Sequence, residues 1–131
     1  MFVMKRYILL FSILLISLAS FSQKSKGAPE MIFKDTIHNF NTIWYMNEAS
    51  HEFTFKNTGK LPLIIERVRS SCGCTVPTWE KSPVPPKGKG KITVKYDTKR
   101  IGQFQKSIKI YSNALNSPVI LVIMGAVKVT D

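Results

Sequence analysis

Hydrophobic and polar residues alternate along much of the chain from about residue 30 onward. Because successive side chains of a strand point to opposite faces, a period of two predicts strands that each bury one face. In His51–Lys56, for example, Phe53 and Phe55 fall on the same face. The predicted strands are His51–Lys56, Leu61–Val68, Lys91–Asp97, Lys106–Tyr111 and Val119–Met124, preceded by a short, broken strand in Met31–Phe33 and His38–Phe40.

Two of these segments carry more specific expectations. In Leu61–Val68 the alternation puts Ile65 and Arg67 on one face and Val68 on the other. Val119–Met124 is continuously apolar, which is typical of a central strand that is covered on both sides.

Turn residues separate the strands, as in Asn57–Lys60, at Gly102 and in Ser112–Pro118. Short strands at this spacing, with almost no helical periodicity, predict an all-β fold: an immunoglobulin-like β-sandwich of about seven to nine strands. We expect Trp44 and Trp79 in its core or at its rim.

The first residues have the pattern of a secretory signal peptide. Lys5 and Arg6 precede an apolar run from Tyr7 to Leu18, which is shorter than the about 20 residues of a membrane-spanning helix. An uncleaved N-terminal anchor is the alternative. We predict a signal peptide over 1–22, a flexible lead-in over 23–29 and a single domain over 30–131, with no transmembrane segment in the mature chain.

The chain is strongly basic, with a net charge of +11. Loss of Lys5 and Arg6 with the signal peptide would lower this by two, to +9. Such a charge favours anionic partners. The lysines between Lys87 and Lys109 alternate with apolar residues, however, so solvated strand faces explain them better than a ligand patch. No nucleic-acid motif occurs, and we expect no nucleic-acid partner.

Cys72 and Cys74 are the only cysteines and the principal candidate site for binding or redox chemistry. Bridged cysteines need Cα atoms within about 6.8 Å. Gly73 could bend the chain enough for a local disulfide, because glycine reaches conformations that other residues avoid. The pair could therefore be a structural turn or local disulfide, a redox couple, or part of a metal site.

A metal site would need further ligands, because two thiolates do not complete a tetrahedral copper or zinc centre. None of the available residues has a characteristic spacing to the cysteines. We find no acid–base pair and no nucleophile or phosphate-binding motif, so we predict no catalytic residues and no cofactor. The residues that could join Cys72 and Cys74 on a metal are Met31, His38, Met46, His51 and Met124.

An ordered set of motifs resembles the bacterial domain-of-unknown-function family 1573. These motifs are Phe55–Gly59, Pro62–Ile65, Ser71–Thr75, Gly90–Val94, Gly102–Phe104, Ser112–Ala114 and Leu121–Val127. The resemblance implies an exported domain of a Gram-negative bacterium, periplasmic or extracellular. It also implies a fold similar to ciliary and centrosomal immunoglobulin-like domains and to major sperm protein. The family has no established biochemical role.

The chain departs from the family pattern at two turns. His38–Asn41 stands where the family usually has an acidic residue and a glycine around the phenylalanine. Pro85–Gly88 stands where a Pro-Gly turn is usual. Any function that depends on these loops would differ in this chain.

Our leading hypothesis is an exported, non-enzymatic module that binds a protein or glycan partner in the cell envelope. We expect its contacts in the turns Ser70–Pro77 and Val84–Gly90, because the loops of sandwiches commonly carry function. One alternative is a thiol-redox or metal-handling protein that uses Cys72 and Cys74. Another is a structural envelope protein that assembles through its sheet edges.

Overall fold

A computed structural model describes residues 3–4 and 26–130. Residues 26–130 contain eight strands in two four-stranded sheets, which confirms the predicted sandwich. The strands are β1 (Met31–Phe33), β2 (Ile37–Trp44), β3 (Ser50–Asn57), β4 (Ile65–Ser70), β5 (Thr75–Trp79), β6 (Lys89–Tyr96), β7 (Gly102–Ser112) and β8 (Val119–Lys128).

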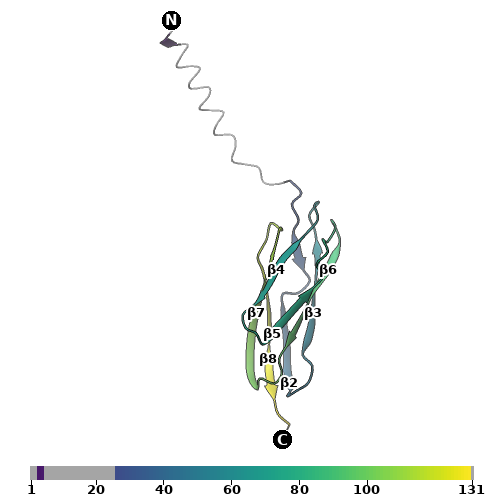
Figure 1. The fold of residues 1–131 in the computed structure, drawn as a ribbon, viewed down its shortest axis with the longest axis vertical. Helices are drawn as coiled ribbons and strands as arrows, with labels where there is room; N and C mark the ends of the chain where they lie inside the picture. Colours follow the sequence, from purple (N-terminus) through teal and green to yellow (C-terminus); the bar gives the residue numbers. More distant parts are fainter. Residues whose placement is uncertain (1–2, 5–25, 131) are drawn as a thin grey trace.

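Each sheet combines strands that are not consecutive in the sequence (Figure 1). Sheet A has the order β1-β3-β6-β5, and sheet B has the order β2-β8-β7-β4. The predicted broken first strand is therefore two strands in different sheets. All neighbouring strands are antiparallel except β2 and β8, which are parallel.

The core lies between the two sheets and is built from the inward positions of each strand. Alternation holds on the neighbouring strands β3 and β6, where Phe53, Phe55, Ile92 and Val94 all point into the buried layer. Burying these side chains is the main favourable contribution to folding, at about 1.5 to 3 kcal/mol for each large apolar side chain. The largest fully buried side chains are Met31, Phe53, Leu63, Ile92, Ile108, Ile110, Leu121 and Ile123.

The predicted faces of Leu61–Val68 are wrong in their second half. The pairing of β4 with β7 shifts register between Ile65 and Arg67. This irregularity moves Val68 toward the core and leaves Arg67 exposed, because one extra residue in a strand inverts every side chain after it.

Two other expectations also need correction. β8 is central in sheet B, but its outer face is not covered, since Ile120 is 48% exposed. The continuous run of apolar residues correctly predicted a central strand. The prediction that both faces of this strand are covered is wrong. The turn predicted over Ser70–Pro77 ends early, because β5 begins at Thr75 and pairs with β6.

Both departures from the family pattern contain a residue in the left-handed conformation. Asn41 has φ 58° and Lys87 has φ 63°. Glycine adopts this region without steric cost, and asparagine tolerates it better than most other residues. His38–Asn41 is not a turn as predicted but lies inside β2, at the register shift between Asn39 and Thr42. The side chain of Asn39 accepts a hydrogen bond from the Asn41 backbone N–H at 2.8 Å, which further fixes this irregularity.

The predicted signal peptide lies almost wholly outside the described residues. Ordered contacts begin inside the predicted lead-in: the carbonyl of Gly27 accepts from the backbone N–H of Lys60, and that of Pro29 accepts from Leu115, each at 2.9 Å. No helix among the described residues is long and apolar enough to cross a membrane.

Candidate functional site

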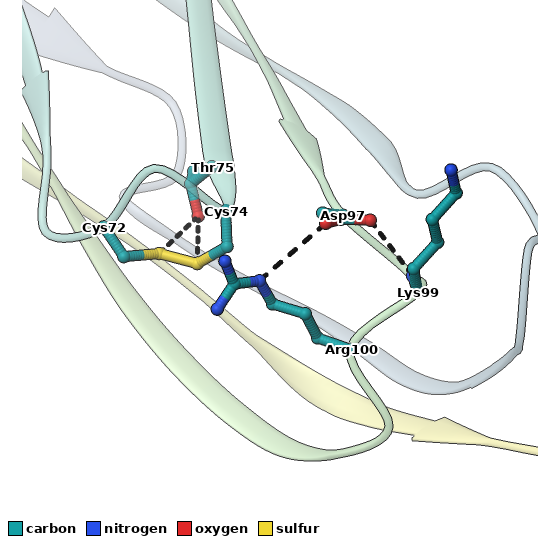
Figure 2. Close-up of polar contacts among 6 residues, drawn as sticks. All are labelled: Cys72, Cys74, Thr75, Asp97, Lys99 and Arg100. Atoms are coloured by element: carbon teal, nitrogen blue, oxygen red, sulfur yellow. Dashed lines mark hydrogen bonds and ion pairs between the residues drawn. A yellow bond between two sulfur atoms is a disulfide. The ribbon is translucent and has the colours of Figure 1, made fainter.

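Cys72 and Cys74 form a disulfide in the turn between β4 and β5, with Cα atoms 5.3 Å apart. Gly73 makes the turn between them and is exposed. The Thr75 hydroxyl lies 3.8 Å from both sulfur atoms (Figure 2). Cys74 is 2% exposed, whereas Cys72 is only partly buried, so the two ends of the bond differ in access from solvent.

Hydrogen bonds to its two cysteine carbonyls hold this turn to both sheets. The Asp97 N–H donates to the Cys74 carbonyl at 2.8 Å. The Ser70 hydroxyl donates to the Cys72 carbonyl at 2.7 Å. The Asp97 carboxylate in turn pairs with the Arg100 guanidinium at 3.8 Å, as Figure 2 shows. Asp97 thus connects the Arg100 side chain to the backbone of Cys74.

The structure does not bring the other candidate metal ligands to the cysteines. His51 on β3 and the disulfide next to β5 lie on opposite sides of β6, about 10 Å apart from strand spacing alone. Met31 is buried in β1, Met46 is exposed after β2, and Met124 lies on the outer face of sheet B. Among the described residues, no three of His, Cys, Asp and Glu cluster as metal ligands.

The arrangement can support thiol–disulfide exchange at the more accessible sulfur, that of Cys72. Metal binding would first require reduction, because thiolates and not disulfide sulfurs are the metal ligands. Of the alternatives that the sequence leaves open, the structure has the local disulfide.

A second candidate site is an open groove of about 520 Å³ on sheet A. By strand alternation its threonines and lysines belong to the outer face, opposite Phe53 and Ile92. Lys91 forms a 2.7 Å ion pair with Glu52 beside it. The groove is lined by Thr54, Thr78, Trp79, Glu80, Lys89, Gly90, Lys91 and Thr93.

Trp79 forms the aromatic part of this groove. The Lys81 ammonium lies 3.3 Å from the centroid of its ring. The indole Nε1 is buried and has no hydrogen-bond partner among the described residues. Sequence reasoning missed this site, since it depends on the cross-strand pair of Thr78 with Thr93. The signal in the sequence that could have indicated it is the repeated threonines and lysines at the exposed positions of these strands.

The two turns predicted as contacts lie at opposite ends of β6. Thr75, just after the disulfide, pairs with Tyr96 at the end of β6, and Lys89, just after the second turn, begins that strand. They therefore cannot form one continuous contact surface.

Comparison with solved structures shows the fold. The chain superposes on a protein of unknown function from Porphyromonas gingivalis W83 with a TM-score of 0.70 and 12% identity, over 82% of this chain and 51% of that one. It superposes on PapD-like domain 7 (an ASH domain) of human CEP192 with a TM-score of 0.69 and 8% identity, over 84% and 94%.

A third similarity is to the VesB protease of Vibrio cholerae, with a TM-score of 0.62 and 14% identity, over 74% of this chain and 32% of that one. The chain thus spans about half of the Porphyromonas protein and about a third of VesB. A search of curated proteins found no match.

Residues 31–127, which hold all but the last residue of the sandwich strands, match a sequence family. Its description is "Protein of unknown function (DUF1573)". The resemblance of the ordered motifs is confirmed, and the chain belongs to the DUF1573 family.

Proposed function

We propose that the protein is an exported, non-enzymatic binding module of the bacterial cell envelope, and that the groove on sheet A takes a glycan partner. The observation that carries this proposal is the composition of the groove. Threonines, lysines and a tryptophan line it together.

The size and chemistry of the groove fit an oligosaccharide. Ligand sites commonly measure about 300 to 1,000 Å³, and this one measures about 520 Å³. Hydroxyls of Thr54, Thr78 and Thr93 can each donate and accept hydrogen bonds. Lys89 adds a positive charge for acidic sugars, and Trp79 adds apolar surface. Within the groove the threonines and lysines share the outer face of sheet A, whereas Trp79 pairs with the inward-facing Ile92 and borders the groove from the core side.

The sheet edges favour a binding module over a structural polymer. β1 has only three residues, and β5 contains Pro77, which has no N–H to donate. The other two edge strands, β2 and β4, each contain a register shift. Short strands, prolines and bulges all discourage pairing with another chain.

Thiol–disulfide exchange is the second candidate function, and the partial exposure of Cys72 favours it. A partner thiolate would attack the Cys72 sulfur, form a mixed disulfide and release the Cys74 thiolate. A second thiol of the partner would then displace Cys72. The partner dithiol becomes oxidised and the protein's disulfide becomes reduced.

The test uses the protein recovered after export and oligosaccharide fragments released from a Gram-negative envelope. We expect binding in calorimetry that a Thr78→Trp substitution abolishes, because the new side chain fills the groove. Gln105→Trp is the matched control. Gln105 is also exposed on a strand, but lies on sheet B, and should leave binding unchanged.

Three results would overturn the proposal. One is the absence of glycan binding by the unsubstituted protein. Another is capture of an envelope protein that Thr78→Trp abolishes, which would give the groove a protein partner instead. The third is turnover of a dithiol substrate that a Cys72→Ala substitution abolishes, which would favour the redox alternative.

A further inference from the structure

One end of the sandwich carries a group of exposed apolar side chains that neither candidate site uses. We name it the aromatic tip and define it as Trp44, Tyr45, Met46, Ile101 and Val129. Their side chains are 45%, 41%, 62%, 62% and 53% exposed, respectively. Single exposed apolar residues are ordinary, but a contiguous group marks an interaction surface.

Strand register brings these residues together from three separate segments. Trp44 pairs with Lys128 at the end of β8. Val127 pairs with Gly102, so Ile101 immediately precedes the paired part of β7. The group therefore lies across neighbouring strands in the order β2-β8-β7, at the end where the described C-terminal residues emerge (Figure 1).

Backbone hydrogen bonds hold the tip in place. The Tyr45 N–H donates to the Lys128 carbonyl at 2.7 Å, and the Asn47 N–H donates to the Trp44 carbonyl at 3.0 Å. The Thr98 hydroxyl donates to the Asn47 carbonyl at 2.7 Å, which ties the β6–β7 loop to this turn. Met46 has φ 68°, a conformation uncommon for residues other than glycine. Trp44, Tyr45 and Met46 are thus presented on a fixed turn.

Basic side chains accompany the tip. Lys128 follows Val127 on β8, and Lys99 and Arg100 precede Ile101. The nearby acids are already engaged: Asp97 pairs with Arg100 at 3.8 Å, and Glu48 pairs with Lys95 at 3.4 Å. Within residues 26–130, no acidic partner lies within salt-bridge distance of Lys99 or Lys128. The tip therefore combines apolar surface with basic side chains.

We infer that the aromatic tip docks on an anionic phospholipid surface. Tryptophan and tyrosine prefer the boundary between the hydrocarbon and the head groups. Lysines close behind them complement anionic head groups, and stable peripheral binding needs both signals. The side chains project from turns at one extremity, which suits insertion into a deformable surface. This inference does not depend on the groove. The groove lies on sheet A, whereas the strands of the tip belong to sheet B.

The test compares variants of the exported protein on vesicles of phosphatidylcholine with and without phosphatidylglycerol. We expect binding to the anionic vesicles and a weaker affinity, by about tenfold or more, in a Trp44→Ser, Tyr45→Ser variant. The matched control is Ile37→Ser, Ile120→Ser. It also removes two exposed apolar side chains, but from the other end of β8, and it should bind normally.

Fluorescence provides a second readout. The chain has two tryptophans, so a Trp79→Phe background reports Trp44 alone, and its emission should shift to shorter wavelength on anionic vesicles. A variant with both Lys99→Glu and Lys128→Glu should bind anionic vesicles more weakly, and its affinity should depend less on salt.

The inference is overturned if the exported protein does not bind anionic vesicles, if it binds neutral vesicles equally well, or if the Trp44 and Tyr45 substitutions leave the affinity unchanged.

Discussion

The imidazole rings of His38 and His51 stack face to face, with centroids 3.6 Å apart and planes 10° from parallel. His38 belongs to β2 of sheet B and His51 to β3 of sheet A. Phe40 meets the His38 ring edge-on, and Phe53 meets the His51 ring edge-on. The stack therefore joins the two sheets along one side of the sandwich. Parallel stacked rings do not direct their nitrogen lone pairs at a common ion, so this arrangement does not chelate a metal.

This contact makes folding sensitive to mild acid. Burial, with the neighbouring His51, holds the pKa of His38 below its usual 6.5. Above pH 6.5 the neutral ring is retained in both states and the contact contributes fully. As the pH falls from 6.5 toward the lowered pKa, the unfolded state binds more protons, so the free energy of unfolding decreases.

Urea unfolding at about pH 7.5 and about pH 5.5 measures this effect. We expect the loss of stability between these values to be smaller in His38→Gln, which has no titrating ring. The difference between the two proteins then reports the protonation of His38 in its contact with His51. Parallel pH profiles for the two proteins would contradict the prediction.

Much of the fold could be predicted because its information is local. β3 and β6 alternate without interruption, so the inward positions of Phe53 and Ile92 follow from sequence alone. The failures have non-local causes. The register shift after Ile65 depends on pairing with β7. β5 is short and contains Pro77, so only its pairing with β6 identifies it as a strand.

The candidate sites also divide into those that depend on local sequence and those that depend on strand pairing. Only Gly73 separates Cys72 from Cys74, so a local disulfide could be named among the alternatives from sequence alone. The groove and the aromatic tip could not, because each assembles side chains from separate strands. Trp44 and Ile101 illustrate this, since only the pairings of β8 with β2 and β7 bring them to one end.

Replacing Asn57 should destabilise the fold strongly. Its side chain is 0% exposed and donates to the carbonyls of Leu61 and Val84, at 2.8 and 3.1 Å. It also accepts from the Gly59 N–H at 3.0 Å. Asn57→Ala removes three hydrogen bonds between a fully buried side chain and the backbone. We therefore expect a loss of about 2 to 4 kcal/mol in urea unfolding. Ser50→Ala, at an exposed position of the same strand, is the control, and an equal loss there would refute this explanation.

The left-handed backbone at Lys87 predicts opposite effects for two substitutions. Its N–H donates to the Asn57 carbonyl at 2.8 Å, which fixes the turn with φ 63°. Lys87→Val should destabilise by about 1 to 2 kcal/mol, because a β-branched residue resists this conformation. Lys87→Gly should be neutral or stabilise by up to about 1 kcal/mol. Lys89→Val, in a strand, should change thermal stability little. Equal effects of valine at both positions would argue against the conformational cause.

The disulfide should contribute little to the stability of the fold. Cys72 and Cys74 enclose only Gly73, and the entropic benefit of closing so short a loop is less than about 2 kcal/mol. The turn also keeps its hydrogen bonds from the Asp97 backbone N–H and the Ser70 hydroxyl when the sulfurs are separated. We therefore expect a Cys72→Ala, Cys74→Ala variant to fold, with a urea midpoint close to that of the protein reduced by dithiothreitol. Unfolding on reduction would instead make the disulfide an essential structural bond, whereas retained folding leaves it free to serve exchange chemistry.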